Sequence, residues 1–70
     1  MYDLEVRAYN YYTVIESRPR GQKIKDSLSS DLWIDYITCS NELTGNRVIK
    51  KQCVTCLNAA HAYLSDYFKK

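Results

Sequence analysis

The sequence has 70 residues, a formal net charge of +2 at pH 7, two glycines and one proline. A chain of this length forms one small domain, here residues 1–70, and buries only about 60% of the surface that its unfolded form exposes. The hydrophobic fraction of 46% and the few glycines and prolines argue against a disordered chain. The net charge is too small to indicate by itself a nucleic acid or a membrane surface as the partner.

The cysteines and the distribution of apolar residues predict a cytoplasmic protein. Three cysteines cannot all pair within one chain, and free thiols are typical of a reducing compartment. Asp3, Glu5 and Arg7 interrupt the beginning of the sequence, which therefore lacks the apolar region of a secretory signal. No stretch approaches the roughly 18 apolar residues of a transmembrane helix, so we expect no membrane contact.

The N-terminal segment has the composition of β-strands. Apolar and charged side chains alternate over residues 2–8, which is typical of a half-buried strand. Residues 11–15, with the sequence YYTVI, are all of types that favour strands. Four of the seven tyrosines of the chain lie in this segment, namely Tyr2, Tyr9, Tyr11 and Tyr12.

The next segment predicts a hairpin. Residues 18–21 predict a turn, because the proline presets φ at the second position and the glycine accepts a positive φ at the fourth. Strands over residues 10–17 and 22–28 would pair on either side of this turn. Residues 32–38 form a third run that favours a strand, after a break at the preceding serines and aspartate.

The C-terminal third predicts an amphipathic helix from Asn46 to Lys69, with a break before it at Gly45. Its apolar side chains recur at every third or fourth position. They are Ile49, Cys53, Cys56, Leu57, Ala60, Leu64 and Tyr67. The predicted fold is therefore α+β, a small antiparallel β-meander of about three strands packed against this C-terminal helix.

A helical interpretation of the first 45 residues is the alternative, and it gives an all-α, three-helix bundle. Two sets of apolar residues would then each share one helix face. They are Leu4, Ala8, Tyr11, Tyr12 and Ile15 in the first set and Leu28, Leu32, Tyr36, Cys39 and Leu43 in the second. Ser29 or Ser30 would cap the second helix, and Gly45 would follow its end. Composition favours the strands, whereas the helix start and stop signals favour the helices.

Cys53 and Cys56 have the CxxC spacing, and His61 follows them. A redox role needs the first cysteine at a helix N-terminus, but the predicted helix places Cys53 about two turns inside. A zinc site needs four convergent ligands, and His61 lies about 140° around the helix from Cys56. We therefore expect both cysteines to pack in the core. We also expect no metal, no cofactor, no catalytic residue and no enzymatic activity.

The basic run from Arg18 to Lys25 is the candidate nucleic-acid site. Arg18 and Arg20 would lie at the predicted turn, while Lys23 and Lys25 would point from one face of the second strand. A two-stranded ribbon can enter the major groove, and clustered cations release counterions from phosphates. Nucleic-acid binding by a basic β-hairpin over residues 18–25 is therefore the alternative function.

The leading prediction is a small non-enzymatic binding or regulatory protein, such as an inhibitor or modulator of a larger protein partner. The chain contains more tyrosine and tryptophan than a small core can hide, and these residues are enriched at interface hot spots. The predicted contact residues are Tyr9, Tyr11, Tyr12 and Trp33. A homodimer is also expected, because association adds stability that a small core lacks.

Overall fold

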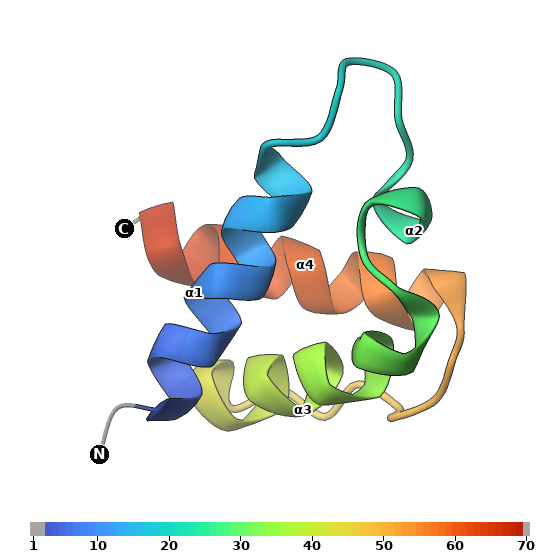
Figure 1. Cartoon of the computed structure of the whole chain (residues 1–70). Coiled ribbons are helices and arrows are strands. Elements are labelled where there is room, and N and C mark those ends of the chain that lie inside the picture. Colours follow the sequence, from blue (N-terminus) through green and yellow to red (C-terminus); the bar gives the residue numbers. More distant parts are fainter. Residues whose placement is uncertain (1–2, 70) are drawn as a thin grey trace.

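The computed structural model describes residues 3–69, and all of the regular elements within them are helical (Figure 1). The elements are α1 (Asp3–Glu16), α2 (Ile24–Ser27), the 3₁₀-helix η1 (Ser30–Leu32), α3 (Trp33–Thr44) and α4 (Val54–Lys69). No strand occurs between residues 3 and 69. The predicted α+β fold with its β-meander is therefore wrong, and the all-α alternative describes the chain.

The segments predicted as strands are helices or loops. Residues 3–16 form α1, the predicted second hairpin strand contains α2, and the run over residues 32–38 lies largely in α3. Tyr2, the first residue of the first predicted strand, lies outside the described residues. The β-favouring residues of α1 adopt a helix because Ala8, Tyr12 and Ile15, spaced by four and three, are all buried. Burial in the tertiary structure outweighs intrinsic preferences of a few tenths of a kcal/mol per residue.

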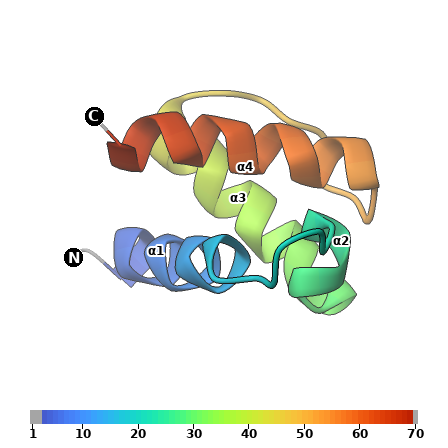
Figure 2. The ribbon, with the colours of Figure 1, turned by 90° about the horizontal axis from the view of Figure 1, so that it is seen from above.

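The three long helices form one small bundle. Figure 2 shows α1 and α4 extending along opposite sides of the view, with α3 crossing between them. α3 packs against both of the other helices, and α1 and α4 also touch each other. The start of α1 lies beside the end of α4, where the Tyr67 hydroxyl donates to Glu5 Oε2 at 2.8 Å. No helix among residues 3–69 has the length and apolar character needed to cross a membrane.

The core lies where these three helices meet. Ile15 of α1, Ile37 of α3 and Leu57 of α4 are completely buried. Ser40 and Ala60 bring α3 and α4 together, and the Ser40 hydroxyl donates to the Ala60 carbonyl at 3.2 Å. Each long helix therefore has one face buried in the core and one face outside it.

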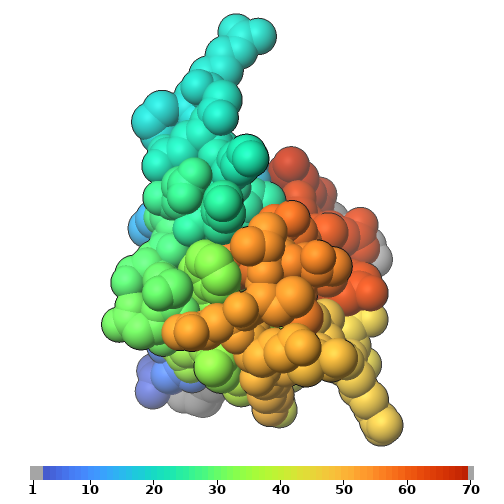
Figure 3. Space-filling view, turned by 90° about the vertical axis from the view of Figure 1, so that its right-hand side faces the viewer, coloured from blue at the N-terminus to red at the C-terminus, as the bar shows by residue number. Residues whose placement is uncertain are grey.

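The connection between α1 and α2 contains the predicted turn but no hairpin. The turn spans residues 19–22, one position later than predicted, with the Gln22 amide donating to the Pro19 carbonyl at 3.0 Å. Gly21 occupies the third position with φ of 91°, which only glycine adopts without strain. The chain then enters α2 instead of a second strand. The loop stands out from the body of the molecule (Figure 3).

The last helix begins at Val54, eight residues later than the predicted start at Asn46. The preceding segment is held in an irregular conformation by Asn41 of α3. The Asn41 amide donates to the Val48 carbonyl, and its oxygen accepts from the Val48 N–H, both at 2.9 Å. The Asn41 side chain thus bonds to the N–H and the carbonyl of Val48, which in a helix would bond to other backbone groups. Gly45, with φ of 75°, ends α3 as the helical alternative predicted.

Candidate functional site

The four aromatic residues predicted to contact a partner lie in different environments. Tyr12 and Trp33 are buried in the core. The Trp33 Nε1–H donates to the Leu28 carbonyl at 2.8 Å, and this bond ties the start of α3 to the segment before it. Tyr9 is 50% exposed. The structure therefore brings Tyr9 to the surface and places Tyr12 and Trp33 inside.

Tyr11 is half-buried between α1 and α3, and its hydroxyl donates to Asp35 Oδ2 at 2.7 Å. The same carboxylate oxygen pairs with Arg7 Nε at 3.2 Å. The hydrogen bond to Asp35, together with burial, raises the pKa of Tyr11 to about 12. Tyr11 thus joins two helices of its own chain through its polar end.

The four cations of the predicted nucleic-acid site are not on a β-ribbon. Arg18 is part-buried, with Nε donating to the Gln22 carbonyl at 2.8 Å and Nη1 donating to the Ile15 carbonyl at 2.9 Å. Arg18 therefore closes the loop and satisfies a carbonyl in the last turn of α1. Arg20, Lys23 and Lys25 are exposed around the loop and α2.

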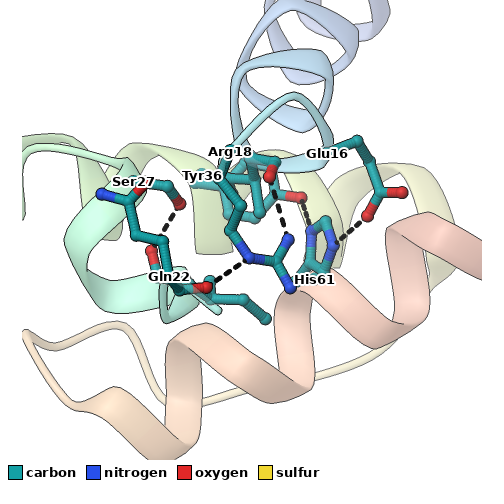
Figure 4. Close-up of polar contacts among 8 residues, drawn as sticks. Glu16, Arg18, Gln22, Ser27, Tyr36 and His61 are labelled. Carbon is teal, nitrogen blue, oxygen red and sulfur yellow. Dashed lines mark hydrogen bonds and ion pairs between the residues drawn. The ribbon is translucent and has the colours of Figure 1, made fainter. Parts of the chain in front are cut away.

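His61 of α4 lies at the centre of a polar network that extends from the buried Tyr36 to the exposed Glu16 (Figure 4). Its Nδ1 lies 2.8 Å from the Tyr36 hydroxyl of α3, and its Nε2 lies 2.8 Å from Glu16 Oε2 of α1. The Tyr12 ring stacks on the imidazole with the ring centroids 5.3 Å apart. Because a carboxylate only accepts hydrogen bonds, Nε2 carries the hydrogen, and Nδ1 accepts from Tyr36 in the neutral ring.

Glu16, His61 and Tyr36 are connected in the same sequence as the acid, histidine and nucleophile of a catalytic triad, but the hydroxyl in the nucleophile position is buried. Tyr36 is completely buried, and burial raises the pKa of its hydroxyl far above the ordinary value of 10.0. Both ring nitrogens of His61 are already bonded within the chain. Among the described residues, every buried side-chain nitrogen or oxygen has a hydrogen-bond partner. The geometry supports a role in holding the three helices together.

The outer face of α1, formed by Val6, Tyr9, Asn10, Thr13 and Val14, is the feature that the sequence predictions missed. On an ideal helix these positions fall within an arc of about 140°. Val6 is 57% exposed and Val14 is 52% exposed. From Val6 to the end of α1 no charged residue falls in this arc, whereas a solvated helix face is normally charged. The helical interpretation could have identified this face, because it consists of positions on the side of the helix opposite the predicted apolar stripe.

Cys53 occupies a different position from the one predicted. It directly precedes the first residue of α4, and its carbonyl accepts the Leu57 amide at 2.9 Å, as an N-cap residue does. The prediction that Cys53 lies two turns inside a helix is therefore wrong, although its side chain is partly buried and packs against the core. Cys56, in the first turn, is 9% exposed and is buried as predicted. No group of three His, Cys, Asp or Glu side chains able to hold a metal ion occurs in residues 3–69.

The His61 network predicts that the protein loses stability in mild acid. Burial lowers the pKa of His61 below its ordinary value of 6.5, with Arg18 and Lys69 acting in the same direction and Glu16 acting against them. The unfolded chain then binds this proton more readily than the folded chain. The contribution is fully present above pH 6.5 and is lost as the pH falls through the lowered pKa. We expect the urea concentration at the unfolding midpoint to be lower at pH 5.5 than at pH 7.5.

The chain offers a direct control for this prediction, because His61 is its single histidine. The imidazole C–H signal in a proton NMR titration should show a midpoint below 6.5 in the folded state. His61→Gln should remove the pH dependence in this range. A midpoint above 6.5, or an unchanged pH dependence in a folded His61→Gln variant, would contradict the assignment.

No protein-family model matches the chain, and neither a curated protein nor a solved structure matches it. The candidate sites are therefore defined by geometry alone. Two features remain as candidates, and they are the outer face of α1 and the start of α4 with Cys53 and Cys56. The first exposes apolar side chains, and the second carries two free thiols.

Proposed function

We propose that this protein is a small non-enzymatic binding protein that acts through protein–protein contacts made by the outer face of α1. The observation that carries the proposal is the arc from Val6 to Val14 that exposes Val6, Tyr9 and Val14 and contains no charged residue. Depletion of charge and enrichment of aromatic residues distinguish the centres of protein interfaces from ordinary surface. The partner is a larger protein whose activity this chain inhibits or modulates.

The outer face of α1 is preorganised for such a contact. The Tyr9 ring lies edge-on to Phe68 of α4, with the centroids 5.2 Å apart, so the ring is held in place before a partner arrives. The Thr13 hydroxyl donates to the Asn10 carbonyl at 2.9 Å, so desolvation of this face does not leave the Thr13 hydroxyl hydrogen unpaired. A rigid aromatic ring and a satisfied threonine hydroxyl lower the cost of binding.

A regulatory role also agrees with the chemistry of the interior. Both nitrogens of His61 are bonded within the chain, and Tyr36 is inaccessible, so this network holds no free base beside an exposed nucleophile. The free thiols are consistent with a reducing compartment, and we propose the cytoplasm as the location.

Site-specific photocrosslinking tests the proposed surface. A benzophenone amino acid at Asn10 should give one discrete protein adduct in extracts of the native cell, whereas the same group at Glu42, exposed on α3, should give none. Val6→Glu should abolish the adduct, because it buries a carboxylate in the contact. Ile34→Glu, which charges a similarly exposed residue on α3, should preserve it. Adducts of equal yield from both positions, or an adduct that survives Val6→Glu, would refute the proposal.

We further propose that the purified chain forms a homodimer through the same face when no other partner is present. Pairing two outer faces would bury Val6, Tyr9 and Val14 and would add stability to a small core. Sedimentation equilibrium should show dimers at micromolar concentration. Val6→Glu should weaken the dimer by about tenfold or more, equivalent to at least 1.4 kcal/mol. A wild-type chain that is monomeric at all concentrations, or a dimer that is indifferent to Val6→Glu, rules out this assembly.

Nucleic-acid binding is a second candidate because Arg18, Lys23 and Lys25 line one hollow of about 490 Å³ between α2 and α4. If this hollow holds phosphate, changing both lysines to alanine should make the slope of log affinity against log salt shallower by about 0.9 per lysine on duplex DNA. The matched control, Lys50→Ala with Lys51→Ala, removes the same charge elsewhere and should leave the slope unchanged. Equal effects of the two pairs, or no salt-dependent binding by the wild type, would exclude this candidate.

A further inference from the structure

The two cysteines at the start of α4 occupy the positions that N-capping geometry pairs. Cys53 is the N-cap residue, and Thr55 and Cys56 are the second and third helical residues. An N-cap side chain accepts hydrogen bonds from these two backbone N–H groups. Cys53 therefore has the position from which an N-cap side chain can reach the N–H groups of Thr55 and Cys56. The two cysteines lie three positions apart at the start of the helix, a spacing at which side chains are neighbours.

The surroundings make the two thiols unequal. Hydrogen bonds from the Cys56 amide and thiol, together with the charge of Lys51, lower the pKa of Cys53. The same thiol–thiol contact raises the pKa of Cys56, because Cys56 donates to the Cys53 sulfur. The pKa of one thiol is thus lowered and the pKa of the other is raised, which is the asymmetry of an attacking and a resolving cysteine.

The cysteines also differ in solvent exposure. Cys53 is partly exposed, whereas Cys56 is 9% exposed and borders an open hollow of about 330 Å³ that Ile49 and Tyr63 also line. The third cysteine, Cys39, is completely buried on α3, and burial raises the pKa of its thiol. Cys39 therefore serves as an internal reference for an unreactive thiol.

We propose that Cys53 and Cys56 form a redox-responsive dithiol that exchanges with low-molecular-weight disulfides and closes to an intramolecular disulfide. Residues three apart in a helix have Cα atoms about 5 Å apart, which lies within the range of about 4.4–6.8 Å that disulfides span. The described residues bring no third ligand to the pair that would favour a metal ion instead. This inference concerns α4 and stands independently of the contact surface proposed on α1.

The reaction balances in two exchange steps. The Cys53 thiolate attacks one sulfur of the small disulfide, the S–S bond breaks, and the released thiolate takes a proton from water. The Cys56 thiol then loses its proton to water, and its thiolate attacks the Cys53 sulfur. The Cys53–Cys56 bond forms, and the second small thiol leaves. The dithiol is oxidised by two electrons, and the small disulfide is reduced to two thiols.

The test uses the full reduced chain and glutathione disulfide as the probe. After acid quenching and alkylation, peptide mass spectrometry should show one Cys53–Cys56 disulfide and a reduced Cys39. In the native reduced protein, iodoacetamide should modify Cys53 on the order of tenfold faster than Cys56, with a pH midpoint below that of a free thiol near 8.5. Cys39 should react only after unfolding.

Two variants separate the roles of the thiols. Cys56→Ser should stop at the mixed disulfide between Cys53 and glutathione, because the resolving thiol is missing. Cys53→Ser retains a good N-cap residue and should therefore fold, but it should lose the fast reaction. A wild-type chain that keeps both thiols reduced in excess glutathione disulfide would overturn the proposal. Equal alkylation rates for all three native cysteines would overturn it as well.

Discussion

The imidazole of His61 is the point on which the packing of the three long helices depends. It lies on α4, accepts the Tyr36 hydroxyl of α3, donates to the Glu16 carboxylate of α1 and stacks on Tyr12. A buried polar group is costly unless each of its hydrogen bonds is made, so a shift of any one helix would leave a partner unsatisfied. The network therefore sets the relative positions of the helices more strictly than apolar contacts alone, which tolerate sliding.

The long connections are held by side chains that bond to backbone atoms. Arg18 joins the end of α1 to the turn that follows, Trp33 fixes the carbonyl of Leu28, and Asn41 pairs with both backbone groups of Val48. These bonds replace the regular secondary structure that irregular segments lack. A chain with a small core can in this way keep ordered loops, and apolar side chains such as Leu28 and Val48 add packing against the core.

Both proposed sites are consequences of this packing. Because α1 turns Ala8, Tyr12 and Ile15 inward, the arc that holds Val6, Tyr9 and Val14 is left outside. Because Asn41 holds the chain before α4 in an irregular path, the helix begins directly after Cys53 and not eight residues earlier. The position of this helix start changes the chemistry of the Cys53 thiol. Two turns inside a helix, no free backbone N–H group could donate to the sulfur, whereas two such groups lie near an N-cap side chain.

The sequence by itself determined that the last segment contains an amphipathic helix and that a break occurs at Gly45. These features depend on local physics, namely a long apolar period and the positive φ that glycine accepts. It could not decide between strands and helices for the first 45 residues, because tyrosine, valine and threonine favour strands locally while their spacing also suits a helix. Only the tertiary structure decided that choice, by burying one helical stripe against α3 and α4. It also decided where α4 begins, and with it the environment of Cys53, because the Asn41–Val48 pairing joins residues that no local pattern relates.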